Sequence, residues 1–151
     1  MALKLTAKQI EDVVRAGLPH MQDGMFTVEE VREGYARIRL PWQKWMLRPG
    51  PAVSGPAQFT AADCAMFALV LAHIGPEVMA VTSDMTMHFV NRGKPGDVIA
   101  EARLLKMGRR LAVMDVTLRS EAEPDKLIAH VSGSYALPIS PSAAPPASSP
   151  A

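Results

Sequence analysis

Cysteine is almost missing from this 151-residue chain, and an excess of charge of either sign is missing too. The one cysteine, Cys64, cannot form an internal disulfide or a cysteine-cluster metal site. Lys and Arg total 16 and Asp and Glu total 15, which gives a formal net charge of +1 with no long run of one sign. This balance provides no electrostatic basis for binding nucleic acid or an anionic membrane.

The start of the chain also lacks the hydrophobic core of a signal peptide, so we expect a soluble, cytoplasmic protein. Residues 57–74 form the most apolar stretch, but their length is near the lower limit for a membrane span, and they contain Asp63. We interpret this stretch as a buried helix. His73 and His88 are typical of core or sheet histidines, because no His, Asp and Glu spacing in the sequence resembles a metal site. We therefore expect no metal and no cofactor.

Hydrophobic residues make up 48% of the chain and charged residues 21%, as in an ordinary globular domain. Thr6 is a suitable N-cap for a short helix over 6–14, and Gly75 ends the long apolar helix. Other hydrophobic runs alternate with a period of two, which is typical of strands. The strands that this alternation predicts are 26–31, 35–40, 78–90, 98–106, 111–119 and 127–137.

One long apolar helix between antiparallel strands determines the predicted fold. A helix that is hydrophobic on every side must be enclosed, and a curved antiparallel sheet wrapped around it is the simplest solution. We therefore predict an α+β hot-dog fold in residues 26–137, preceded by a helix and linker over 1–25. Residues 138–151 are Pro, Ser and Ala except for one isoleucine, and we expect this tail to be disordered.

Four segments resemble the PaaI-like family of hot-dog acyl-CoA thioesterases: SGPAQFTAAD, AVTSDMTMHFV, KPGDVIAEARLLKMGRRLAVMDVTL and SGSYAL. The family usually has His-Gly-Gly at the start of its central helix, with an acidic residue nine positions after the histidine. Here Ser54, Gly55 and Pro56 occupy the tripeptide, and Asp63 is nine positions after Ser54. The spacing is kept, although the tripeptide is partly changed. The resemblance implies hydrolysis of an acyl-CoA to the free acid and coenzyme A.

Ser54, Gly55 and Pro56 together make a sound helix start. The Ser54 hydroxyl can accept a hydrogen bond from an unpaired helix N–H, and Pro56 suits the first helical position. The N–H of Gly55 stays free at the positive end of the helix dipole, where a developing oxyanion is stabilised. The resemblance implies this role for Gly55, and contacts with substrate for Ser54 and Pro56. Plain capping with a turn glycine is the alternative.

Asp63 is the only acidic residue between Glu33 and Glu77, and its neighbours on the predicted helix are mostly apolar. A carboxylate in such surroundings suits a general base or a nucleophile. The alternative is an aspartate on the helix surface with its charge in solvent. By resemblance, Asp63 either activates a water molecule or attacks the thioester to form a mixed anhydride. The sequence does not choose between these two routes.

Gly55 and Asp63 cannot both reach one carbonyl group from a single helix. Eight residues at ~1.5 Å each separate them by ~12 Å along the helix axis. Both groups must lie ~3 Å from the reacting centre. If both are catalytic, Gly55 comes from one subunit and Asp63 from another, and the protein is at least a two-fold homodimer. The resemblance implies the same arrangement, because the sites of the family lie at a dimer interface. Since the dimers of the family commonly pair, a homotetramer stays open as well.

Thr82 is a further candidate, because the resemblance implies a hydroxyl there that orients the water or the carboxylate. A strand threonine in a cross-strand pair is the alternative. Strict alternation over residues 78–90 predicts that Thr82 shares a face with Asp84, on the side opposite Met85.

Three arginines complete the candidate substrate contacts. Arg48 lies where relatives often carry an asparagine that helps to hold the acyl carbonyl. Arg109 and Arg110 either meet the phosphates of coenzyme A or are solvated turn residues.

Two other functions stay open. A hot-dog module could bind acyl-CoA or another acyl ligand without turnover, because Arg48 and the changed tripeptide depart from the family pattern. A hot-dog hydratase would need an Asp/His pair near a strand, which Asp84 and His88 imitate poorly.

Overall fold

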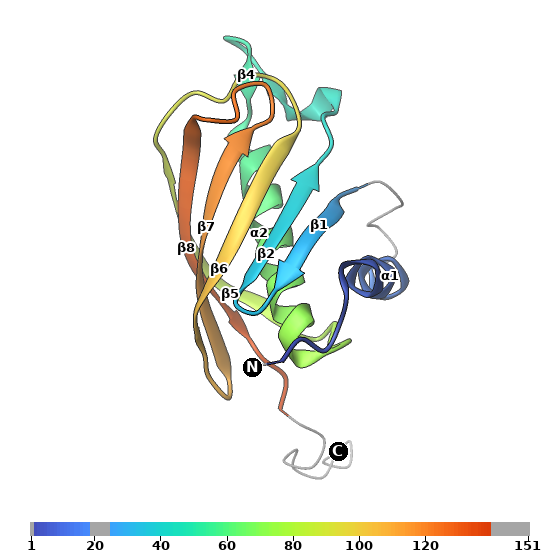
Figure 1. Cartoon of the computed structure of the whole chain (residues 1–151). Helices are drawn as coiled ribbons and strands as arrows, with labels where there is room; N and C mark the ends of the chain where they lie inside the picture. The colour runs from blue at the N-terminus through green and yellow to red at the C-terminus, as the bar shows by residue number, and fades with distance from the viewer. Residues whose placement is uncertain (1, 19–24, 140–151) are drawn as a thin grey trace, which may run out of the picture.

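The computed structural model describes residues 2–18 and 25–139. Its main feature is a six-stranded antiparallel sheet that curves around one long helix, α2 (Gly55–Ile74), as Figure 1 shows. The predicted hot-dog fold is confirmed. Most of the predicted tail and part of the predicted linker lie outside the described residues. Across the sheet, the strands follow in the order β1 (Thr27–Arg32), β2 (Tyr35–Leu40), β6 (Val98–Met107), β7 (Leu111–Ser120), β8 (Leu127–Ala136) and β5 (Val81–Phe89).

Helix α2 has the boundaries that its sequence dictates. Ser54 is the N-cap, Pro56 lies in the first turn, and Gly75 ends the helix with a φ of 95° that favours glycine. Within the described part of the chain, α2 is the one helix long and apolar enough to cross a membrane, but 78% of its apolar window is buried inside the fold. Because the sheet covers this surface, α2 is a core helix.

Helix α1 (Ala7–Gly17) covers one edge of the sheet, beside β1 in Figure 1. Thr6 caps it through a capping box with Gln9, as the sequence predicts for its start, although the helix continues three residues beyond the expected end. Its buried residues Ile10 and Val14 pack into the main core. The Glu11 carboxylate accepts a hydrogen bond from the Val28 N–H at 3.0 Å, so a side chain of α1 blocks part of the β1 edge.

Strand β5 forms the opposite edge of the sheet and contains a β-bulge at Ser83. Thr82 pairs with Tyr135, and the next pair in register is Asp84 with Ser134. Because the bulge inserts one residue, Thr82 lies on the helix side of the sheet, where Met85 also packs, and Asp84 lies on the outer side. The prediction that Thr82 and Asp84 share a face is therefore wrong.

The segment before α2 contains short elements that the sequence did not predict. A 3-10 turn, η1 (Lys44–Met46), leads into a two-stranded ribbon of β3 (Leu47–Arg48) and β4 (Ala52–Val53). Gly50 turns this ribbon with a φ of 100°. The Ser54 N–H then donates to the Met46 carbonyl at 2.7 Å, which fixes the ribbon against the start of α2.

Candidate functional site

The Asp63 carboxylate is held by two hydroxyl groups from neighbouring strands. Its Oδ1 accepts hydrogen bonds from Thr82 Oγ1 and from the Tyr135 hydroxyl, both at 2.6 Å. Thr82 and Tyr135 are paired directly across β5 and β8, so the sheet register brings both donors to the same oxygen. In the described part of the chain, no hydrogen bond to Asp63 Oδ2 was found. One carboxylate oxygen is therefore fixed and the other is available for chemistry.

Tyr135 is the site residue that sequence reasoning missed. Its side chain is 3% exposed and stacks on the Phe67 ring with 5.8 Å between centroids. Burial, together with the negative charge of Asp63, raises the pKa of the Tyr135 hydroxyl, so this group stays protonated and donates to the carboxylate. It lies 72 positions after Asp63, and the pairing of β8 with β7 and β5 brings it to the helix.

A cavity of about 480 Å³ opens beside Asp63, with Thr82 and Tyr135 also on its wall. Its other walls are largely apolar and come from the residue after α1, from α2 and from the segment around the start of β5. The apolar side chains that line it are Leu18, Phe59, Phe67, Val78, Ala80 and Val81. Cys64 also lines this cavity but is 5% exposed, and burial raises the pKa of its thiol to about 12. The arrangement is a carboxylate facing a space suited to an apolar group.

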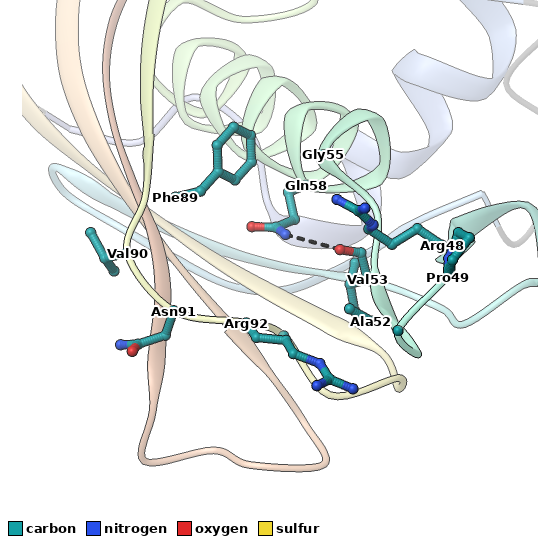
Figure 2. A pocket seen from close by; sticks show the side chains of 12 residues that line it. Arg48, Pro49, Ala52, Val53, Gly55, Gln58, Phe89, Val90, Asn91 and Arg92 are labelled. Atoms are coloured by element: carbon teal, nitrogen blue, oxygen red, sulfur yellow. Dashed lines mark hydrogen bonds between the residues drawn. The ribbon is translucent and has the colours of Figure 1, made fainter.

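A second cavity, of about 620 Å³, lies at the start of α2 and includes Gly55 (Figure 2). The Gly55 N–H is in the first turn, where a helix offers no internal acceptor. A Cβ atom on Gly55 would come within 3.4 Å of the Phe89 ring, so Phe89 closely borders this backbone. Arg48 and Arg92 line the same cavity, and Figure 2 shows the Arg48 guanidinium extending back toward the helix start.

The other predicted contacts are distributed differently. The Ser54 hydroxyl accepts a hydrogen bond from the Ala57 N–H at 3.2 Å, which makes Ser54 a helix cap. Neither Ser54 nor Pro56 is among the residues lining the Gly55 cavity. Arg109 and Arg110 belong to the turn between β6 and β7, at the end of the sheet opposite β4 (Figure 1), and line neither cavity.

The histidine at the end of α2 is a satisfied core residue. His73 is 1% exposed, its Nδ1 lies 3.0 Å from the Leu69 carbonyl, and its Nε2 accepts from the Gly34 N–H at 3.1 Å. Within residues 2–18 and 25–139, no group of three or more His, Cys, Asp or Glu side chains is arranged to hold a metal ion.

Gly55 and Asp63 do not meet within one chain. They line two different cavities that share no residue. The Gly55 cavity borders Phe89, at the C-terminal end of β5, whereas the Asp63 cavity borders Thr82, near its N-terminal end. The cavities of the two predicted catalytic groups thus border opposite ends of the same edge strand.

Comparison with known proteins identifies similarity to thioesterases. A family model for the thioesterase superfamily matches residues 50–126, about half of the chain. A provisionally assigned thioesterase from Silicibacter sp. TM1040 is 37% identical, and the match covers 91% of this chain and 95% of that one with a TM-score of 0.82.

Two other solved structures share the fold. Zebra fish thioesterase superfamily member 2 is 24% identical, with coverage of 89% of this chain and 100% of that one and a TM-score of 0.74. The E. coli PaaI protein is 22% identical, with coverage of 86% and 96% and a TM-score of 0.67. A provisionally named esterase from Saccharolobus solfataricus is 26% identical over 89 residues, and the match spans 59% of this chain and 59% of that protein.

Proposed function

The chain belongs to the thioesterase superfamily, and from this premise we propose that it hydrolyses an acyl-CoA to the free acid and coenzyme A. The observation that carries the proposal is the carboxylate of Asp63, held through one oxygen by Thr82 and Tyr135 at the wall of an apolar cavity. Such a carboxylate is oriented for attack, and the cavity suits the acyl group of a thioester.

Asp63 acts on the thioester carbonyl through its second oxygen, Oδ2. In one route it takes a proton from water while the water oxygen bonds to the carbonyl carbon. In the other it bonds to that carbon itself, and water later hydrolyses the anhydride. In both routes the carbonyl oxygen becomes an anion, the carbon–sulfur bond then breaks, and the thiolate leaves. The Gly55 N–H at the start of α2 stabilises the anion.

The active site forms between two copies of the chain. Eight residues of one helix separate Gly55 from Asp63 by ~12 Å, too far for both to contact one carbonyl. Strand β5 is an edge strand of nine residues with exposed apolar side chains at both ends, Val81 (55% exposed) and Phe89 (56% exposed). A long open edge of this kind favours pairing with a second strand.

Two-fold pairing of β5 with its copy supports this arrangement. Thr82 adjoins Asp63 and Phe89 adjoins Gly55. An antiparallel pairing centred between Thr82 and Phe89 brings the Phe89 end of one strand next to the Thr82 end of the other. Each protomer then gives Gly55 to one site and Asp63 to the second, as an isologous interface requires. The homodimer is the smallest active unit, and the homotetramer is compatible with it.

Arginines supply the charge that coenzyme A needs. Arg48 and Arg92 line the Gly55 cavity, and their guanidinium groups can bind the phosphates of coenzyme A through paired hydrogen bonds. This role falls to them rather than to Arg109 and Arg110, which lie at the far end of the sheet. We place this activity in the cytoplasm.

A steady-state assay with aromatic, short-chain and medium-chain acyl-CoAs tests the proposal. We expect release of coenzyme A from at least one of them, and a loss of roughly 10²–10⁴-fold in kcat for Asp63→Asn, as for removal of a general base. Asp125→Asn, in the turn between β7 and β8, is the matched control and should keep wild-type kcat. Binding of these compounds without hydrolysis, or ordinary turnover by Asp63→Asn, would refute the proposal.

A further inference from the structure

The side-chain carbonyl of Gln58 is buried without a partner beside the Gly55 cavity. Gln58 is 4% exposed and lines this cavity, three residues after Gly55 on α2. Its Nε2 donates to the Val53 carbonyl at 3.2 Å, but its Oε1 has no hydrogen-bond partner. In the described part of the chain, the other such buried side-chain oxygen is Thr117 Oγ1 on β7. Because buried acceptors are almost always paired, an unpaired one at a cavity wall indicates a ligand that donates.

The hydrogen bond to Val53 sets the direction in which Gln58 accepts. A primary amide is planar, so fixing its nitrogen on one side turns its oxygen to the other. Figure 2 shows the Gln58 oxygen directed toward the side of the cavity bounded by Phe89 and Asn91.

The charged side chains of this cavity limit which ligands can bind there. The guanidinium groups of Arg48 and Arg92 can only donate. A matching ligand must offer them acceptors and must offer Gln58 one N–H or O–H. Coenzyme A has both features, because its phosphates accept and its thiol arm carries an amide N–H two methylene groups from the sulfur.

The spacing on the helix also fits the thiol arm. Positions three residues apart on a helix are surface neighbours, with ~5–6 Å between their Cβ atoms. In a thioester, the sulfur and two methylene groups separate the carbonyl carbon from the first amide nitrogen, which is a similar span. A thioester whose oxygen lies on the Gly55 N–H therefore brings its first amide to Gln58.

We propose that Gln58 Oε1 accepts a hydrogen bond from the first amide N–H of the thiol arm, and that Gln58 thereby selects amide-bearing thioesters. The inference rests on the proposed thioesterase function and on Gly55 as the oxyanion donor. The acyl group is directed away from Gln58, into the apolar cavity beside Asp63 of the second copy.

Two thioesters that differ by one atom test this role. Both carry the acyl group that the wild type hydrolyses fastest, one as its S-(2-acetamidoethyl) thioester and the other as its S-(2-acetoxyethyl) thioester, in which oxygen replaces the N–H. We expect the wild type to prefer the amide by about tenfold in kcat/KM, after correction for the hydroxide-catalysed rates, as for one buried hydrogen bond. In Gln58→Met this preference should fall to about one.

Two further variants separate selection from folding. Gln58→Glu keeps an acceptor at this position and should keep the preference, even if its overall rate is lower. Thr117→Val removes the other unpaired buried oxygen, lies outside both cavities, and should keep the wild-type preference. If no Gln58 variant folds, the proposal is tested by the corrected wild-type ratio of kcat/KM for the amide to that for the ester. A ratio near one overturns the proposal.

Two other outcomes have definite meanings. If Gln58→Met instead changes the preference between benzoyl and 4-hydroxybenzoyl thioesters, the donor is on the acyl group and the proposal is overturned. If the wild type hydrolyses no thioester, the proposed function fails, and the dissociation constants of the benzoyl S-(2-acetamidoethyl) and S-(2-acetoxyethyl) thioesters, measured by calorimetry, decide the role of Gln58 separately. A tenfold tighter binding of the amide supports it, and equal binding overturns it.

Discussion

Two neutral hydroxyl groups, from Thr82 and Tyr135, donate to the same oxygen of Asp63. Two hydrogen bonds to one oxygen fix the plane of the carboxylate, and Asp63 lies at the wall of the cavity. In the proposed mechanism the two side chains are therefore positioning residues, and Asp63 is the residue that reacts. Their effect should appear in turnover more than in substrate affinity, because the acyl cavity is otherwise apolar.

Tyr135→Phe tests this positioning role. The variant keeps the ring that stacks on Phe67 and removes the hydroxyl. A hydrogen bond to a charged group contributes ~1.5–3 kcal/mol, so we expect kcat to fall by roughly ten- to a hundredfold with KM little changed. Thr82→Val should act in the same direction, and steady-state kinetics of both variants and of the double variant measure their coupling. An unchanged kcat in Tyr135→Phe would mean that the hydroxyl serves packing alone.

Cys64 adjoins Asp63 but takes no part in the proposed chemistry. Burial, and then the charge of Asp63, raises the pKa of its thiol from 9.0 to about 12. A raised pKa means less thiolate, so at pH 8 the folded protein should react with iodoacetamide far more slowly than the urea-unfolded chain. The associated stability is complete below about pH 9 and is lost as the pH rises toward 12. Mass spectrometry of the alkylated protein measures the rate of labelling, and rapid labelling of the native thiol would contradict the buried position.

The sequence singled out the candidate residues of α2 but missed one of the residues that hold them. Gly55 and Asp63 were chosen through a resemblance to a family spacing within one helix, which is local information. Tyr135 has no local signal, because its contact with Asp63 depends on the register between β5 and β8. The face of Thr82 was predicted wrongly for a related reason, since the bulge at Ser83 breaks the period of two on which the prediction depends.

At the scale of elements, the start of α2 combines a structural cap with the proposed oxyanion donor. Ser54 was predicted as both a cap and a substrate contact, and the structure shows the cap, with its hydroxyl 3.2 Å from the Ala57 nitrogen. Its N–H also anchors the ribbon of β3 and β4 through Met46. The sequence predicted the cap from residue type but not the ribbon, because strands of two residues have no detectable periodicity.

Ser54→Ala tests the cap. Loss of the hydroxyl leaves the Ala57 N–H unpaired, and we expect the free energy of unfolding to fall by ~1 kcal/mol, as for other N-cap deletions. Ser54→Asp keeps an acceptor and should restore most of this loss. Urea denaturation monitored by circular dichroism measures both variants. If Ser54→Asp is as unstable as Ser54→Ala, the hydroxyl has a role other than capping.

At the scale of the whole molecule, the two edges of the sheet are treated differently. The β1 edge is covered by α1, with Glu11 bonded to the Val28 N–H, whereas β5 has no strand on its outer side within the described residues. The hot-dog fold was predictable because an apolar helix needs a sheet around it. The proposed homodimer follows from the spacing of Gly55 and Asp63, but the edge proposed to form it required the structure, since it depends on which ends of β5 meet Gly55 and Asp63.

Subunit complementation tests this dimer directly. Gly55→Pro removes the proposed oxyanion N–H at a helix position that accepts proline, and the extended Ser54 backbone, with a ψ of 156°, suits the residue before a proline. Gly55→Ala keeps the N–H and serves as its control. We expect Gly55→Pro and Asp63→Asn to be nearly inactive alone. After unfolding and refolding together in equal amounts, half of the dimers should be mixed, and each mixed dimer has one intact site.

The mixture should therefore recover up to about a quarter of wild-type activity, because one of two sites works in half of the dimers. A mixture of Asp63→Asn with a chain that carries both Gly55→Pro and Asp63→Asn contains no intact pair of Gly55 and Asp63. This mixture should stay inactive, which controls for refolding. Sedimentation measures the oligomeric state of each sample. If Gly55 and Asp63 acted within one chain, no combination of the two single variants would restore turnover, and a fully active wild-type monomer would equally exclude the shared site.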